Sequence, residues 1–140
     1  MSTLNVQTIQ SNSTGFNNVV TFAQSGGVEN GTLCRAWARF NGTGTVAIND
    51  DFNVNSIGDS GTGKYTVNFS NALTNANYSV LATGTAGNTN GGHVSVDTTQ
   101  FGGTGTNTSS TTSFNLRALD GSSGTYDDHE WVNIAVFSSY

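Results

Sequence analysis

The stretch that decides the fold is Lys64-Tyr65-Thr66-Val67-Asn68-Phe69. Tyr65, Val67 and Phe69 alternate with polar residues, which is the two-residue period of a strand that buries one face. The same alternation recurs in Ala36-Ala38-Phe40, Tyr78-Val80-Ala82, Val94-Val96 and Phe114-Leu116-Ala118, and an apolar segment from Trp131 to Phe137 closes the chain. Turn-forming residues separate most of these segments, and none has the 3.6-residue period of a helix. The pattern predicts an all-β fold with roughly eight short strands after Cys34, arranged as an antiparallel β-sandwich or a jelly-roll-like domain.

The first 33 residues differ from the rest of the chain in their pattern of polar and apolar residues. Two short apolar pieces, residues 4–9 and 19–22, are separated by a turn-forming cluster, and residues 25–31 indicate a glycine-rich flexible joint. Strands this short bury too little apolar area to stay ordered alone. We therefore expect an extended N-terminal arm over residues 1–33 and a β-sandwich domain over residues 34–140. The arm is expected to dock on a partner through four apolar anchors, Val6, Ile9, Val19 and Phe22.

The charge of the chain excludes several classes of partner. With four Lys and Arg residues and a net charge of −5, the chain offers no basic patch for a phosphate backbone. It has no apolar run long enough to span a bilayer and no secretory signal, so we expect synthesis in a cytoplasm, no nucleic-acid partner and no membrane insertion. The one cysteine, Cys34, excludes an internal disulfide and is expected to be a small core residue.

Gly58-Asp59-Ser60-Gly61-Thr62-Gly63-Lys64 has the glycine and lysine spacing of a phosphate-binding loop. The next residue is Tyr65 rather than the Ser or Thr that ligates magnesium. The predicted strand that follows also leaves no helix N-terminus to hold a phosphate. We interpret the segment as a glycine-rich hairpin turn and expect no nucleotide site.

Acidic residues gather before the last strand in Asp127-Asp128-His129-Glu130, with Asp120 upstream. Their spacing does not match the EF-hand loop, which favours a solvated loop, with Trp131 beginning the core, over a calcium site. His93 is far from His129 in sequence, and neither is expected to ligate a metal. The adjacent Asp50-Asp51 would face opposite sides of a strand and so would not form the carboxylate pair of a glycosidase. We expect a protein that is not an enzyme and has no cofactor.

Two loops rich in Gly, Thr, Asn and Ser are expected at residues 88–92 and 102–110. Long loops on a β scaffold often carry binding, and solvated connections without a specific role are the alternative. The candidate receptor-binding residues of these loops are Asn88, Asn90, His93 and Asn107.

The chain contains one distinctive run, which consists of Arg35-Ala36-Trp37-Ala38-Arg39-Phe40-Asn41-Gly42-Thr43-Gly44-Thr45-Val46-Ala47-Ile48, Asp51-Phe52-Asn53-Val54-Asn55-Ser56-Ile57, Gly63-Lys64-Tyr65-Thr66-Val67-Asn68-Phe69 and Ala76-Asn77-Tyr78. This run resembles a module of phage tail-fibre-like virion proteins, especially those of cyanobacterial and marine tailed phages. The opening residues 1–9 and the closing segments 126–128 and 131–137 are also similar to proteins of this kind. The resemblance covers residues 35–80 best and the central loops hardly at all.

The resemblance implies a structural protein on the virion surface and, by analogy with fibre heads, a homotrimer. It implies no catalytic residues. A tail fibre or fibre tip that recognises a host surface glycan is the first expectation. If Met1 is the natural start, we expect neither an anchoring domain nor a long shaft, which favours the alternative of a capsid decoration protein bound to the major capsid protein. In both cases the partners are further copies of the chain and other virion proteins of the tail or capsid.

Overall fold

The structure of the protein is a computed structural model. It describes residues 19–24, 27–86, 92–97 and 109–138. Within these ranges every regular element is a strand, which confirms the predicted all-β class. The ten strands are β1 (Val19–Gln24), β2 (Gly27–Thr32), β3 (Cys34–Asn41), β4 (Ala47–Phe52), β5 (Val54–Asp59), β6 (Lys64–Phe69), β7 (Tyr78–Ala86), β8 (Gly92–Asp97), β9 (Ser113–Asp120) and β10 (His129–Ser138).

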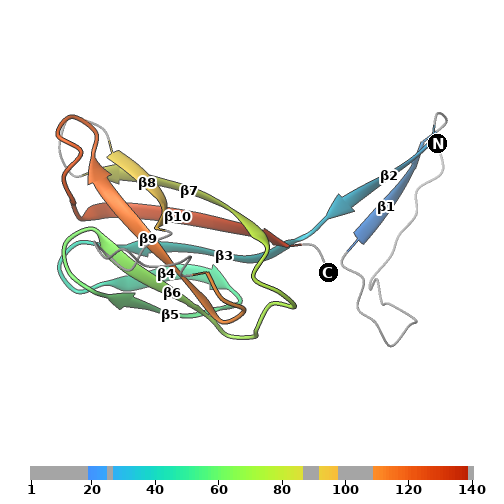
Figure 1. Cartoon of the computed structure of the whole chain (residues 1–140), viewed down its shortest axis with the longest axis horizontal. Coiled ribbons are helices and arrows are strands. Elements are labelled where there is room, and N and C mark those ends of the chain that lie inside the picture. The colour runs from blue at the N-terminus through green and yellow to red at the C-terminus, as the bar shows by residue number, and fades with distance from the viewer. Residues whose placement is uncertain (1–18, 25–26, 87–91, 98–108, 139–140) are drawn as a thin grey trace.

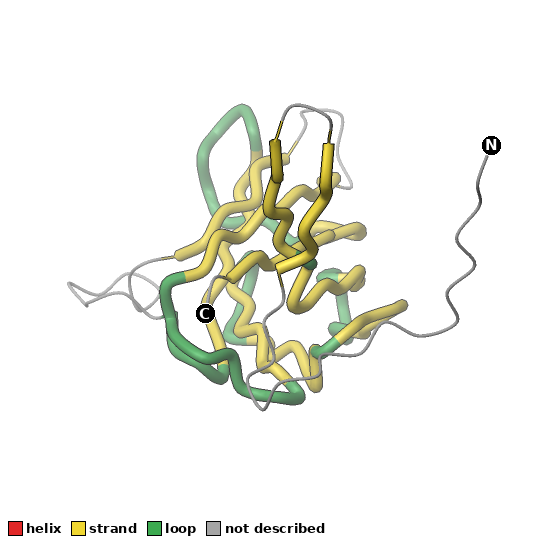
Figure 2. The backbone as a smooth tube through the Cα atoms, turned by 90° about the vertical axis from the view of Figure 1, so that its right-hand side faces the viewer, coloured by secondary structure: helices red, strands yellow, loops and turns green. Residues whose placement is uncertain are grey.

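Eight of these strands form two antiparallel four-stranded sheets. The first sheet has the order β4-β3-β10-β7 and the second sheet has the order β5-β6-β9-β8. The two sheets face each other as two layers (Figure 1), and Figure 2 views the same backbone from the side of the hairpin. We call β3 to β10, with their described connections, the two-sheet body. Its eight strands agree with the number expected from the alternation after Cys34.

The chain passes from the first sheet to the second at Asn53, the one residue between β4 and β5. Its φ is 57°, in the left-handed region that Asn tolerates better than most residues. The Asn53 side-chain amide donates to the Arg35 carbonyl at 3.1 Å, and its oxygen accepts from the Asn71 backbone N–H at 2.8 Å. These bonds fix the corner against two segments that are distant in sequence.

The core lies between the two sheets and is built from the alternating residues. Its buried apolar members are Ala36, Ala38, Phe40, Val54, Tyr65, Val67, Phe69, Leu73, Val94, Phe114, Leu116, Ala118, Val132, Ile134 and Val136. Three aromatic rings, Phe69, Tyr78 and Phe114, pack together with centroids 5.7–6.0 Å apart. The two-residue period thus identified the inward face of β3, β6, β7, β8 and β9.

A buried histidine fills the place where β7 and β8 approach each other. His129 is fully buried, and its Nε2 lies 3.3 Å from the Leu119 carbonyl oxygen. Gly84 and Gly92 leave the space that the ring occupies, since a Cβ on Gly92 would lie 2.7 Å from Nε2. The prediction of a solvated segment with Trp131 as the first core residue is therefore wrong. His129 begins the core, and Trp131 is 38 % exposed on the outer face.

β1 and β2 form a separate two-stranded antiparallel sheet, with pairs running from Val19↔Thr32 to Gln24↔Gly27. The glycine-rich segment that was expected to be a flexible joint is mostly strand, because residues 27–31 belong to β2. Leu33 is the one residue between β2 and β3. Figure 1 shows this hairpin extending beyond one end of the two-sheet body.

Candidate interaction surface

Four apolar side chains form a continuous row across the outer face of the first sheet. Trp37 on β3 is in register with Phe52 on β4 and with Ala135 on β10, and Ala135 is in register with Leu81 on β7. Trp37 points outward because its two neighbours on β3 point into the core. The exposed fractions are 37 % for Trp37, 55 % for Phe52 and 60 % for Leu81. A contiguous exposed apolar patch of this kind marks an interaction surface.

A polar row runs beside the apolar row. Arg39 on β3 is in register with Asp50 on β4 and Asn133 on β10, and Asn133 is in register with Thr83 on β7. The Arg39 guanidinium lies over the ring of Trp131, 3.9 Å from its centroid, which holds the arginine against the sheet. Both charged residues of this row are exposed. The face therefore offers an apolar stripe bordered by hydrogen-bonding groups.

The outer face of the second sheet has the opposite character. Its polar side chains bond to one another between neighbouring strands: Thr66 to Asn115 at 2.9 Å, Asn68 to Ser56 at 3.1 Å and Arg117 to Ser95 at 3.1 Å. Side chains that satisfy each other in this way have less to gain from a partner. The first sheet is thus the better candidate for an interaction.

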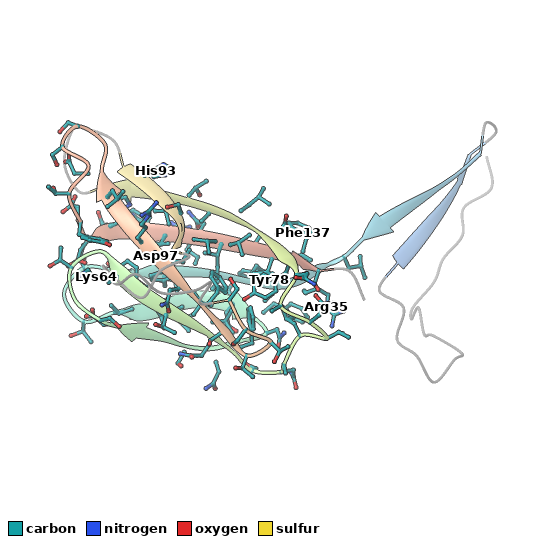
Figure 3. All side chains as sticks on the ribbon, viewed as in Figure 1. Arg35, Lys64, Tyr78, His93, Asp97 and Phe137 are labelled. Atoms are coloured by element: carbon teal, nitrogen blue, oxygen red, sulfur yellow. The ribbon has the colours of Figure 1, made fainter. Side chains whose placement is uncertain are left out.

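A pocket of about 380 Å³ adjoins the apolar row. Its lining residues are Leu33, Cys34, Arg35, Phe52, Asn53, Ser70, Asn71 and Ala72. Phe52 belongs to both the pocket and the row, and Leu33 is 52 % exposed at the root of the hairpin. Figure 3 shows Arg35 and Phe137 at this end of the two-sheet body. Phe52 therefore joins the apolar row to the pocket, and Leu33 joins the pocket to the hairpin.

The glycine-rich segment at residues 58–64 is a hairpin turn, as predicted from the sequence. β5 and β6 pair on either side of it, the Ser60 N–H donates to the Lys64 carbonyl at 2.9 Å, and the Lys64 N–H donates to the Gly61 carbonyl at 2.9 Å. The Lys64 ammonium lies over the ring of Tyr126, 4.6 Å from its centroid. This lysine therefore has a structural contact within the chain.

Asp128 ties the turn to the last strand. Its Oδ1 accepts from the Gly63 N–H at 2.7 Å and from the Tyr65 hydroxyl at 2.9 Å, and that hydroxyl also lies 3.1 Å from the Gly42 carbonyl oxygen. Burial of the Tyr65 ring, and then its hydrogen bond to the Asp128 carboxylate, raise the pKa of the phenol well above its usual value. The acidic segment here stabilises the fold.

Asp120 has a similar structural role in the turn after β9. Its Oδ1 accepts hydrogen bonds from the backbone N–H and hydroxyl groups of Ser122 and Ser123. These bonds favour the ionised form and hold the pKa of the Asp120 carboxyl well below its usual range. In the ranges that the structure describes, no group of three or more His, Cys, Asp and Glu side chains is placed to hold a metal ion.

The residues expected to bind partners are only partly within the described ranges. Val6, Ile9, Asn88, Asn90 and Asn107 lie outside them. Val19 and Phe22 belong to β1. His93, which was expected in a loop, lies instead in β8, where it is exposed and in register with Leu119. Figure 3 shows His93 and Asp97 along β8.

The described residues that flank the two candidate loops lie at opposite ends of β8. The first is anchored by the end of β7 and the start of β8, and the second by the end of β8 and Ser109. Six residues of β8 separate these anchors, which corresponds to about 17 Å of extended chain.

Comparison with known proteins supplies no relative. Scans against protein-family models, curated proteins and solved structures each found no match. None of the described residues belongs to a helix that could cross a membrane.

Proposed function

We propose that the chain is a non-enzymatic structural protein on the surface of a tailed-phage virion, of the tail-fibre or fibre-tip type. In this proposal the two-sheet body is an antiparallel β-sandwich or jelly-roll-like head, and the residues before it are a docking arm. Three copies assemble into one unit, which attaches to other tail proteins and contacts a glycan on the host surface.

The observation that carries the proposal is that one outer sheet face leaves a row of apolar side chains exposed, while polar side chains on the other face hydrogen-bond to one another. Trp37, Phe52 and Leu81 remain exposed in the single chain, as expected of a subunit built to be covered in an assembly. The segments that resemble phage fibre modules form β3, β4, β5, β6 and β10, which include the strands that carry most of this face.

A capsid decoration protein is the second candidate, and the N-terminal hairpin favours it. Both outer edges of the β1–β2 pair are unpaired among the described residues. Such edges can add to a strand of another protein. A hairpin that extends beyond the body could therefore clamp a capsid subunit.

The first experiment is the copy number of the chain in purified virions, measured by quantitative mass spectrometry against the major capsid protein. A few copies per particle would support the tail-fibre type. A number comparable to that of the capsid protein would assign the chain to the capsid surface as a decoration protein. Absence from purified particles would refute the virion function in both forms.

A further inference from the structure

The apolar row on the outer face of the first sheet has two unlike halves. Its β4–β3 half is the aromatic pair Phe52 and Trp37, and its β10–β7 half is the smaller Ala135 and Leu81. Trp131 is also exposed on β10, but it lies outside this row, under the Arg39 guanidinium. The polar row divides in the same way, because Asp50 and Arg39 belong to the first half and the neutral Asn133 and Thr83 to the second.

We propose that copies of this chain join through this face, with the β4–β3 half of one copy packed on the β10–β7 half of the next. The proposal rests on the oligomeric structural role proposed above and names the surface that forms the oligomer. The occupant of the face is thus a second copy of the same chain.

The order of the strands makes this pairing available by symmetry. When two copies are related by a two-fold axis that runs parallel to the strands and just outside the face, β3 of one copy lies over β10 of its neighbour, and β4 lies over β7. With three copies around a three-fold axis of the same direction, the same unlike halves meet in turn around the ring. Both arrangements align the apolar rows with each other and the polar rows with each other.

The shapes of the two halves are complementary. Trp37 would lie against Ala135 of the neighbouring copy, and Phe52 against Leu81 of the neighbouring copy. A large side chain facing a small one lets two sheet faces interdigitate, as they do in stacked sheets about 10 Å apart. Burying these exposed apolar side chains gives the assembly its driving force.

The charges of the face disfavour an arrangement that stacks β3 on β3 of the second copy. Packing β3 on β3 would bring Arg39 close to its own counterpart, and like charges facing each other weaken an interface. Packing unlike halves instead places Arg39 against Asn133 and Asp50 against Thr83 of the neighbour. Neutral amide and hydroxyl groups hydrogen-bond with either charge. No ion pair joins Arg39 and Asp50 within the described part of the chain: Arg39 contacts the Trp131 ring, and Asp50 accepts a hydrogen bond from the Asp51 N–H.

The test measures the mass of the full chain in solution by light scattering after size-exclusion chromatography. The expected mass is two or three times 14.5 kDa. Phe52→Lys and Leu81→Glu should each reduce the mass to that of one chain, since each places a charge opposite an apolar partner. The control Asn55→Lys, at an exposed position of β5 in the second sheet, should leave the mass unchanged.

The double variant F52K/L81E tests which halves meet. The introduced lysine on β4 would then face the introduced glutamate on β7 of the neighbour, so the assembly should return in low salt and weaken as salt is added. Circular dichroism of each variant shows whether the monomer is still folded. Dissociation of the single variants without recovery in the folded double variant would overturn the pairing of unlike halves.

Two further outcomes overturn the proposal. One is a wild-type chain that stays monomeric at all concentrations. If F52K and L81E then abolish binding to host glycans, the face binds glycan and not a second copy. The other is an oligomer that both single variants leave intact. Failure of the virion function is seen separately, because a chain that assembles in solution yet is absent from virions refutes that function alone.

Discussion

Removal of one hydroxyl group, by Tyr65→Phe, tests how the chain holds its two sheets together. Tyr65 is fully buried on β6 of the second sheet. Its hydroxyl lies 2.9 Å from Asp128 Oδ1 and 3.1 Å from the carbonyl oxygen of Gly42, which follows β3 of the first sheet. A phenol has one proton for these two acceptors, so the bond to the charged carboxylate contributes most.

The expected loss follows from these contacts. A hydrogen bond to a charged group contributes about 1.5–3 kcal/mol, and the buried Gly42 carbonyl loses a weaker share of the same donor. Phenylalanine fills the same space apart from the oxygen, so no large cavity forms. We expect the free energy of unfolding to fall by about 2–3 kcal/mol and the melting temperature by on the order of 10 °C.

The pH dependence gives a second signature of the same group. The pKa of Tyr65 is raised by burial and then by the Asp128 carboxylate, whereas a tyrosine in the unfolded chain ionises near pH 10. Above about pH 10 the unfolded state has lost a proton that the native state keeps, so wild-type stability falls as the pH rises. Tyr65→Phe lacks this contribution, and the stability difference from wild type should shrink above about pH 10.

The assay is urea unfolding followed by tryptophan fluorescence, at fixed protein concentration, at pH 7 and in the alkaline range. Tyr126→Phe is the matched control, because its ring keeps the contact with the Lys64 ammonium. A Tyr65→Phe protein as stable as wild type at neutral pH would refute the reasoning. So would a stability difference that stays constant through the alkaline range.

Three further predictions concern other fixed points of the fold. Asn53→Ala should lower the free energy of unfolding by about 2 kcal/mol in urea titrations, because it loses the bond to Asn71 and strains a left-handed backbone; Asn53→Gly should recover part of this loss. Gly92→Ala should lower stability by about 2–3 kcal/mol, since its Cβ would meet the His129 ring, and adding His129→Ala should reduce the extra cost in a double-mutant cycle. The lowered pKa of Asp120 stabilises the native state only while the same carboxyl is ionised in the unfolded chain, so this contribution is lost as the pH falls below about 4. Asp120→Asn lacks the contribution, and its melting temperature should therefore fall less steeply with pH than that of the wild type. Thermal melts across the acid range measure this.

The inward faces of the strands could be predicted from the sequence alone. Tyr65, Val67 and Phe69 alternate with polar residues and are buried, because a strand turns successive side chains to opposite sides. The same logic sends Trp37 outward from β3 once its alanine neighbours are placed in the core. The signal for the exposed row was therefore present in one strand.

The completion of that row could not be predicted, because it depends on which strands are neighbours. Alternation assigns a residue to a face but says nothing of pairing between distant segments. Trp37 meets Ala135 only because β3 pairs with β10, almost a hundred residues later in the chain. The burial of His129 could not be predicted for a related reason, because the space for its ring is left by glycines on two other strands.

The pairing of Cys34 with Phe137 has a mechanical consequence. The two-sheet body begins and finishes on adjacent strands at the same end, where Figure 3 labels Phe137 beside Arg35. Tension that draws these two points apart would load the hydrogen bonds between β3 and β10 one after another. Tension between this end and the opposite end, where β10 begins, would instead load all of these hydrogen bonds at once in shear. The two-sheet body should thus resist force applied along its strands and unfold more easily when Cys34 and Phe137 are pulled apart.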